Sequence, residues 1–187
     1  MPTPDTASLP SLPTLPTPLA LSTATTLGQL ADETPDVMTL HTQDAFRMFT
    51  GRAADSQTKA PAIPGGRRFA AVLKSIWYLS ANDNPYADWI LIRVYQSLLT
   101  IRSQMAQAIR VREAEFEALR RKGLNLSVLS SRSPATVALG FRSPYGYATA
   151  EAIVEFDYHV RMVKTLVLKD RLSDGDGRAA IREVGRG

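Results

Sequence analysis

Few residues of this chain have the types and the spacing that catalysis or metal binding requires. The sequence holds two histidines, His41 and His159, far apart, and no cysteine. Asp83 and Asp88 flank the start of an expected helix, where carboxylates commonly cap the backbone and complement the helix dipole. The sequence therefore predicts no catalytic residues, no metal site and no cofactor. We do not expect an enzyme.

The segment 136–142 has the alternation of a β-strand with two unlike faces. One face is apolar and is formed by Val137, Leu139 and Phe141. The other face is unusually small and is formed by Thr136, Ala138, Gly140 and Arg142. A two-stranded ribbon of this kind fits the major groove of DNA. An ordinary strand that covers a helical core is the alternative, and the pattern alone favours it.

The elements that must position this strand are mostly helical. Apolar residues at three- and four-residue spacing predict helices over 67–79, 85–122 and 148–172. The long middle helix begins at Asn84-Pro85 and ends at Gly123. It carries a heptad-like seam of Leu91, Val94, Leu98, Ile101, Met105 and Ala108. The seam packs on the helix 67–79 or on a second copy, and the sequence does not choose.

The fold class is predicted to be α+β and mainly α. Residues 124–128 alternate as 136–142 do, and turn-forming residues 130–134 separate the two segments. These segments form a short β-hairpin, or two strands with other partners. A long helix and a hairpin or ribbon strand followed by a helix therefore make up the expected fold.

The chain is predicted to fold only beyond its first 60 residues. Residues 1–60 are expected to be a disordered, proline-rich leader and linker, in which Leu-Pro recurs at the three-residue period of polyproline II. A short helical turn is expected near 44–49. Residues 61–172 should form a single helical domain with a small β element, and 173–187 a frayed tail with one short helix over 178–184.

The net charge of +4 is divided unevenly along the chain. Residues 1–58 carry two basic and six acidic side chains, for a charge of −4, and residues 59–187 carry the other 20 basic and 12 acidic ones, for +8. A basic folded part favours DNA as a partner, although other basic proteins bind anionic membranes, or neither. No apolar run is long enough to cross a bilayer and the N-terminus lacks signal-peptide features, so we expect no membrane contact and a cytoplasmic location.

Three blocks of sequence resemble a known family. They are Asn82-Asp83-Asn84-Pro85-Tyr86-Ala87-Asp88-Trp89, Arg142-Ser143-Pro144-Tyr145-Gly146-Tyr147 and Glu155-Phe156-Asp157-Tyr158-His159-Val160-Arg161. Together with the long helix they look like the AcaB-type family of bacterial integrating conjugative elements, and the similarity spans roughly residues 40–184. The first block is the most specific.

The resemblance implies a transcriptional regulator with a ribbon-helix-helix-like DNA-binding fold. In that fold the strand 136–142 pairs with its copy in a homodimer and directs Thr136, Ala138 and Arg142 toward base edges, and Arg142 is the best suited to read guanine. Candidates for phosphate contacts, chosen by their charge, are Arg132, Arg161, Lys164 and Arg178.

We therefore expect a DNA-binding regulator of an integrating conjugative element, acting on its transfer genes. The alternative is a non-enzymatic structural or adaptor protein of the conjugative transfer machinery, in which the long helix and the leader dock other proteins. The two differ at the strand 136–142. A regulator of this kind requires that strand to pair across a twofold axis with Arg142 exposed, whereas an adaptor predicts the strand buried in an internal sheet.

Overall fold

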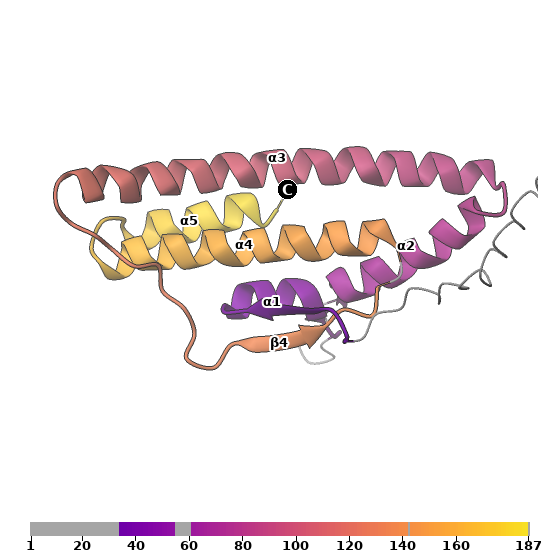
Figure 1. Cartoon of the computed structure of the whole chain (residues 1–187), viewed down its shortest axis with the longest axis horizontal. Helices are drawn as coiled ribbons and strands as arrows, with labels where there is room; N and C mark the ends of the chain where they lie inside the picture. The colour runs from indigo at the N-terminus through magenta and orange to yellow at the C-terminus, as the bar shows by residue number, and fades with distance from the viewer. Residues whose placement is uncertain (1–33, 55–60, 142, 187) are drawn as a thin grey trace, which may run out of the picture. The chain divides into compact units, whose positions relative to one another are not determined.

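The structure is a computed structural model that describes residues 34–54, 61–141 and 143–186 (Figure 1). The elements follow in the order β1 (Val37–Leu40), α1 (Gln43–Thr50), β2 (Gly51–Arg52), β3 (Ile63–Pro64), α2 (Gly66–Ser80), α3 (Pro85–Arg121), β4 (Ala135–Ala138), α4 (Pro144–Leu168) and α5 (Asp174–Val184). The described residues belong to one compact unit, Thr34–Gly187. The predicted class, α+β and mainly α, is confirmed.

Helix α4 is the centre of the fold, because α1, α2, α3, α5 and β1 all pack against it. Five of its apolar residues are spaced as in a buried helix face. Ile153, Phe156, Val160 and Val163 are at most 3% exposed, and Val167 is partly buried. The helix begins earlier than predicted because Ser143 caps it, its side-chain oxygen accepting a hydrogen bond from an N–H of the first turn.

Helix α3 begins and ends as its local sequence predicts. The Asn84 side chain accepts hydrogen bonds from the N–H groups of Tyr86 and Ala87 at 3.1 and 3.2 Å, and Pro85 is the first helical residue. Gly123 follows the last turn with a φ of +87°, the left-handed conformation that commonly ends helices.

The apolar seam of α3 finds its partners inside the chain. Leu91, Leu98 and Met105 are buried, and α3 packs on both α2 and α4. Figure 1 shows α3 running alongside α4 and α5. The choice that the sequence left open between an internal partner and a second copy is thereby resolved for this seam.

The predicted hairpin is wrong, although its second strand exists. Strand β4 pairs antiparallel with β1, and residues 124–128 form no strand. The alternation in that segment has another cause, since Leu126 and Val128 are partly buried against α3 and α4 while their neighbours are exposed. A second pair of two-residue strands, β2 and β3, joins Gly51 to Pro64 and Arg52 to Ile63.

The predicted leader ends earlier than residue 60, because β1 and α1 belong to the folded unit. Met38, Leu40, Ala45 and Phe49 are at most 5% exposed and join the same core cluster as the buried residues of α4. Four apolar residues over this short segment are too few to form a recognisable periodicity in the sequence. They are buried because they pack against α4. The Leu-Pro repeat lies outside the described residues.

The C-terminal segment is a packed helix where a frayed tail was predicted. Helix α5 starts at Asp174, capped by the Ser173 side chain, and packs on α4. Gly177 is buried, and a Cβ at this position would lie 2.6 Å from a methyl group of Val167. The close approach of the two helices explains why a glycine-rich sequence is nevertheless ordered here.

Candidate nucleic-acid interface

Strands β1 and β4 form a small antiparallel ribbon with one buried face and one open face. The register pairs Val37 with Ala138 and Thr39 with Thr136, and these four residues form the exposed face. Met38 lies on the other face, is 5% exposed, and belongs to the core. A further hydrogen bond of 2.7 Å, from the N–H of Leu139 to the carbonyl of Asp36, extends the ribbon beyond β4.

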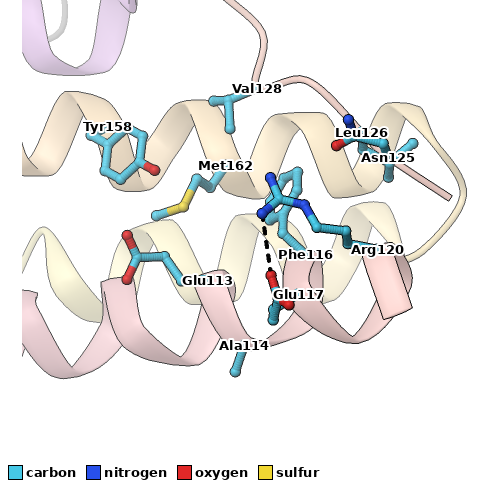
Figure 2. Close-up of a pocket in the computed structure, with 10 residues that line it drawn as sticks. All are labelled: Glu113, Ala114, Phe116, Glu117, Arg120, Asn125, Leu126, Val128, Tyr158 and Met162. Atoms are coloured by element: carbon cyan, nitrogen blue, oxygen red, sulfur yellow. Dashed lines mark hydrogen bonds and ion pairs between the residues drawn. The ribbon is translucent and has the colours of Figure 1, made fainter. Parts of the chain in front are cut away.

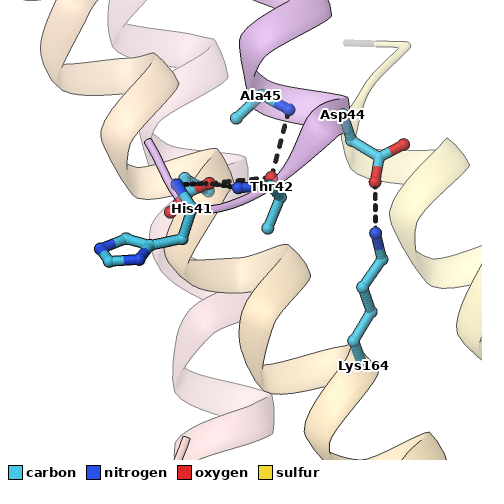
Figure 3. Close-up of polar contacts among 6 residues, drawn as sticks. His41, Thr42, Asp44, Ala45 and Lys164 are labelled. Atoms are coloured by element: carbon cyan, nitrogen blue, oxygen red, sulfur yellow. Dashed lines mark hydrogen bonds and ion pairs between the residues drawn. The ribbon is translucent and has the colours of Figure 1, made fainter. Parts of the chain in front are cut away.

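One buried carboxylate holds the end of β1 and the start of α1 on α4. The Asp157 Oδ1 accepts hydrogen bonds from the N–H of His41 at 3.0 Å and from the N–H and the hydroxyl of Thr42, both at 2.8 Å. The Thr42 hydroxyl oxygen accepts in turn from the N–H of Ala45, which caps α1 (Figure 3). The ribbon is therefore fixed relative to the helical core by Asp157.

The segment that leads into β4 is held by a second group of hydrogen bonds. The imidazole Nδ1 of His41 accepts from the N–H of Ser131 at 3.2 Å, so the two strands of the ribbon are also tied together at this end. The backbone of Leu129 donates to the Thr165 hydroxyl at 2.9 Å and accepts from Arg161 Nε at 2.6 Å. Both partners of Leu129 lie on α4.

The structure brings together part of the predicted set. Arg132, Thr136 and Ala138 are exposed in or just before β4, whereas Arg142 lies outside the described residues. β4 pairs with β1 of its own chain and its outward face is open, so it is not buried in an internal sheet as the adaptor alternative expected. The described residues contain no strand on its other edge.

The remaining predicted residues already have acceptors in the same chain. Arg161 binds the Leu129 carbonyl, and the Lys164 ammonium lies 2.6 Å from an Asp44 carboxylate oxygen (Figure 3). Arg178 pairs with Asp174 on the surface of α5, and the hydrogen bond to this carboxylate raises the pKa of Arg178. Figure 1 shows α5 and β4 on different sides of α4, so Arg178 does not join the ribbon.

Sequence reasoning missed the partner strand and the residues that hold it. Val37 and Thr39 complete the exposed face, and the only local signal for β1 was the alternation of Thr39 with Met38 and Leu40. The role of Asp157 left no local signal, because its three donors come from residues far away in the chain.

A separate pocket of about 450 Å³ lies between the C-terminal half of α3, α4 and residues 125–128 (Figure 2). Phe116 and Met162 line it together with Glu113 and Glu117, and Arg120 pairs with Glu117 at 3.4 Å. None of the predicted DNA-contacting residues lines this pocket.

Among the residues that the structure describes, no three acidic or histidine side chains are placed to hold a metal ion. In the same residues, no helix is long and apolar enough to cross a membrane.

The fold and the ribbon define a mainly helical α+β protein that presents a two-stranded β-ribbon on its surface. The family model described as "Transcriptional regulator AcaB" matches residues 26–186, and the chain belongs to this family. This membership gives the chain a role in transcriptional regulation, a role that is generally non-enzymatic.

A solved structure has the same fold. The crystal structure of selenomethionine-containing AcaB from uropathogenic E. coli superposes with a TM-score of 0.50 and 17% sequence identity, covering 81% of this chain and 70% of that chain. No curated protein sequence matches the chain.

Proposed function

We propose that this protein binds double-stranded DNA through the open face of the β1–β4 ribbon and regulates transfer genes of an integrating conjugative element. The observation that carries the proposal is the exposure of four small or β-branched side chains on one face of an anchored two-stranded ribbon, Val37, Thr39, Thr136 and Ala138. Membership of a regulator family supports the regulatory part.

The dimensions of the ribbon suit a major groove. Strands of four residues are about 13 Å long at 3.3 Å per residue, and the groove is about 12 Å wide. Small side chains let the backbone approach the base edges closely, and the hydroxyls of Thr39 and Thr136 offer a donor and an acceptor each. The methyl groups of Val37 and Ala138 suit contact with thymine methyls.

Basic residues that precede and follow β4 in the sequence are our candidates for the contacts with the DNA backbone. Arg132 is exposed just before β4, and Arg142 follows β4 in the sequence. We propose Arg132 for phosphate and Arg142 for guanine or phosphate. The proposed set of DNA contacts excludes Arg161, Lys164 and Arg178, because each of them binds an acceptor in its own chain.

Fluorescence anisotropy with DNA from the transfer promoters of the host element, against scrambled DNA at two salt concentrations, tests the proposal. We expect tighter binding to promoter DNA and weaker binding at higher salt. Thr136→Glu should lower the affinity at least about 10-fold, because it places a carboxylate against the groove. Arg142→Ala should reduce the preference for promoter DNA. The matched control is Ala118→Glu, at an exposed position in the C-terminal half of α3.

Equal binding to both DNAs, or an unchanged affinity in Thr136→Glu, would contradict the ribbon as the reading surface. Loss of affinity in Ala118→Glu but not in Thr136→Glu would place the DNA on α3.

A specific feature also supports self-association. Of the 19 large hydrophobic side chains that are exposed in the described residues, 11 lie between Phe69 and Leu99, on α2 and the first half of α3. Large apolar surface that a chain leaves exposed commonly marks an interaction site. We propose a second copy of this chain as the occupant of this surface, which we name the α2–α3 face.

The composition of the α2–α3 face supports a symmetric partner. It contains five Trp and Tyr side chains, and the cations near them stack on rings: Arg93 lies 5.3 Å from the centre of Trp89, and Lys74 lies 6.0 Å from that of Tyr78. Aromatic residues and arginine are enriched in interface cores, and a twofold axis would bring the same residues from both copies together. If instead another protein occupies the face, the adaptor function gains support.

A further inference from the structure

A second cleft, distinct from the ribbon, lies between α3 and α5 with α4 beneath it. Its volume is about 800 Å³, within the range of small-molecule sites. His159 of α4 lines it, although this residue is only 1% exposed. A buried imidazole therefore forms the bottom of the cleft.

The imidazole of His159 is the unusual feature of this cleft. Neither ring nitrogen makes a hydrogen bond within the described residues. The Ala180 carbonyl is near enough to favour a protonated ring, but its geometry is not that of a hydrogen bond. Buried polar groups are nearly always partnered, so two orphaned nitrogens in one ring require an explanation. A ligand oxygen that accepts a hydrogen bond from the ring N–H would supply a partner for one of them.

The charges around the cleft indicate the sign of that ligand. Arg110, Arg112 and Arg186 line it against a single carboxylate, Glu183. Arg110 binds the neutral side-chain oxygen of Gln107. Among the ion pairs of the described residues, none involves Arg110 or Arg186. Arg112 pairs with Glu115 at 2.9 Å, yet it acts electrostatically on His159. The lining retains an excess of positive charge.

We propose that this cleft binds a small organic anion that carries a carboxylate or phosphate monoester group, with His159 and the surrounding arginines as its polar contacts. The apolar side chains that α3 and α5 contribute to the walls accommodate the carbon skeleton. The site is separate from the ribbon and does not depend on DNA binding.

Histidine-selective ¹⁵N NMR of the full chain tests this site, because His41 and His159 are the only histidines. The probes are benzoate, citrate and glucose 6-phosphate at up to about 10 mM, which would nearly saturate a site with a Kd of about 1 mM. We expect at least one probe to shift the His159 ring signals along a saturating curve while those of His41 stay in place. A response to citrate or benzoate alone identifies a carboxylate site, and a response to glucose 6-phosphate alone identifies a phosphate site.

A charge-reversal variant distinguishes a site from general anion binding. Arg186→Glu, at an exposed position on the rim, should weaken the saturating response at least about 10-fold, corresponding to the loss of one charged contact. Lys169→Glu makes the same charge change at the exposed end of α4, outside the cleft, and should not alter the response. Unmoved His159 signals, linear responses without saturation, or equal effects of the two variants would overturn the proposal.

Discussion

Asp157 shows how a single buried side chain positions the proposed DNA-binding surface. It is 2% exposed, and it accepts three hydrogen bonds from His41 and Thr42. We predict that Asp157→Ala lowers the free energy of unfolding by about 3 kcal/mol, because three donors at the start of α1, two of them on the buried Thr42, lose their acceptor. Urea denaturation followed by circular dichroism measures this change.

A carboxylate at the surface provides the comparison. Asp44 pairs with Lys164, but the two side chains are 40% and 47% exposed. Asp44→Ala should therefore cost no more than about 1 kcal/mol. Equal losses in the Asp44 and Asp157 variants would show that the buried hydrogen bonds do not anchor β1 and α1.

His159 predicts a pH dependence of stability. Burial lowers its pKa below the ordinary value of 6.5, and the nearby positive charge of Arg112 lowers it further. Below pH 6.5 the unfolded chain therefore binds a proton that the folded chain does not, so the free energy of unfolding falls as the pH falls toward the folded-state pKa. The slope is at most about 1.4 kcal/mol per pH unit for one proton.

The measurement is urea denaturation from pH 7.5 down to about 5.5, with His159→Leu as the variant that removes the titrating ring. Glu155 contributes in the opposite direction. Its pKa is raised mainly by burial, so the folded chain binds a proton more readily than the unfolded chain and is stabilised as the pH falls. Ending the series at about pH 5.5 limits this contribution. We expect a shallower slope in His159→Leu. If the His159 ring titrates with a midpoint at or above pH 6.5, its pKa is not lowered in the folded chain and the prediction is wrong.

At the scale of the elements, local signals predicted helices far better than strands. The Asn84-Pro85 start and the Gly123 end of α3 are readable because each depends on a few adjacent residues. Strand β1 is not readable, since its four residues acquire a partner only through β4, far along the chain. The exposed face of β4 was therefore predicted correctly in part, at Thr136 and Ala138, while its pairing was not.

The junction between α1 and α2 depends on a glycine that the structure leaves no room to replace. A Cβ on Gly65 would lie 2.2 Å from the backbone nitrogen of Gly51 and 2.4 Å from the carbonyl oxygen of Phe49. We predict that Gly65→Ala costs more than about 2 kcal/mol, because backbone atoms of the β2–β3 pair must move. Thermal or urea denaturation measures the loss.

Gly140→Ala is the matched control, because a Cβ there meets nothing within 4 Å and the residue has no positive φ. It should change stability by no more than about 1 kcal/mol. A Gly65→Ala variant as stable as Gly140→Ala would mean that the close contact of the two glycines is dispensable.

At the scale of the whole molecule, the described residues leave many large apolar side chains of α2 and α3 exposed. The heptad-like seam, for which the sequence left open a partner in the same chain or in a second copy, packs internally on α2 and α4. A different stripe of α3, which includes Trp89, Ile92 and Leu99, is exposed. The sequence could not separate these two stripes, because both consist of apolar residues at helical spacing and only the fold decides which one is buried.

The α2–α3 face predicts the assembly state. We expect size-exclusion chromatography with light scattering to give a dimer, and Trp89→Glu to weaken dimerisation at least about 30-fold, because a charge replaces a central aromatic contact worth about 2 kcal/mol or more. Leu168→Glu is the control, since Leu168 is 64% exposed at the end of α4 and lies outside this face. If the wild-type chain is monomeric at concentrations of about 100 μM, its Kd exceeds that of an ordinary specific dimer, and the face must serve another protein. If Leu168→Glu disrupts the dimer and Trp89→Glu does not, the interface involves the end of α4, and the exposed aromatic residues of α2 and α3 remain available to a partner of the adaptor kind.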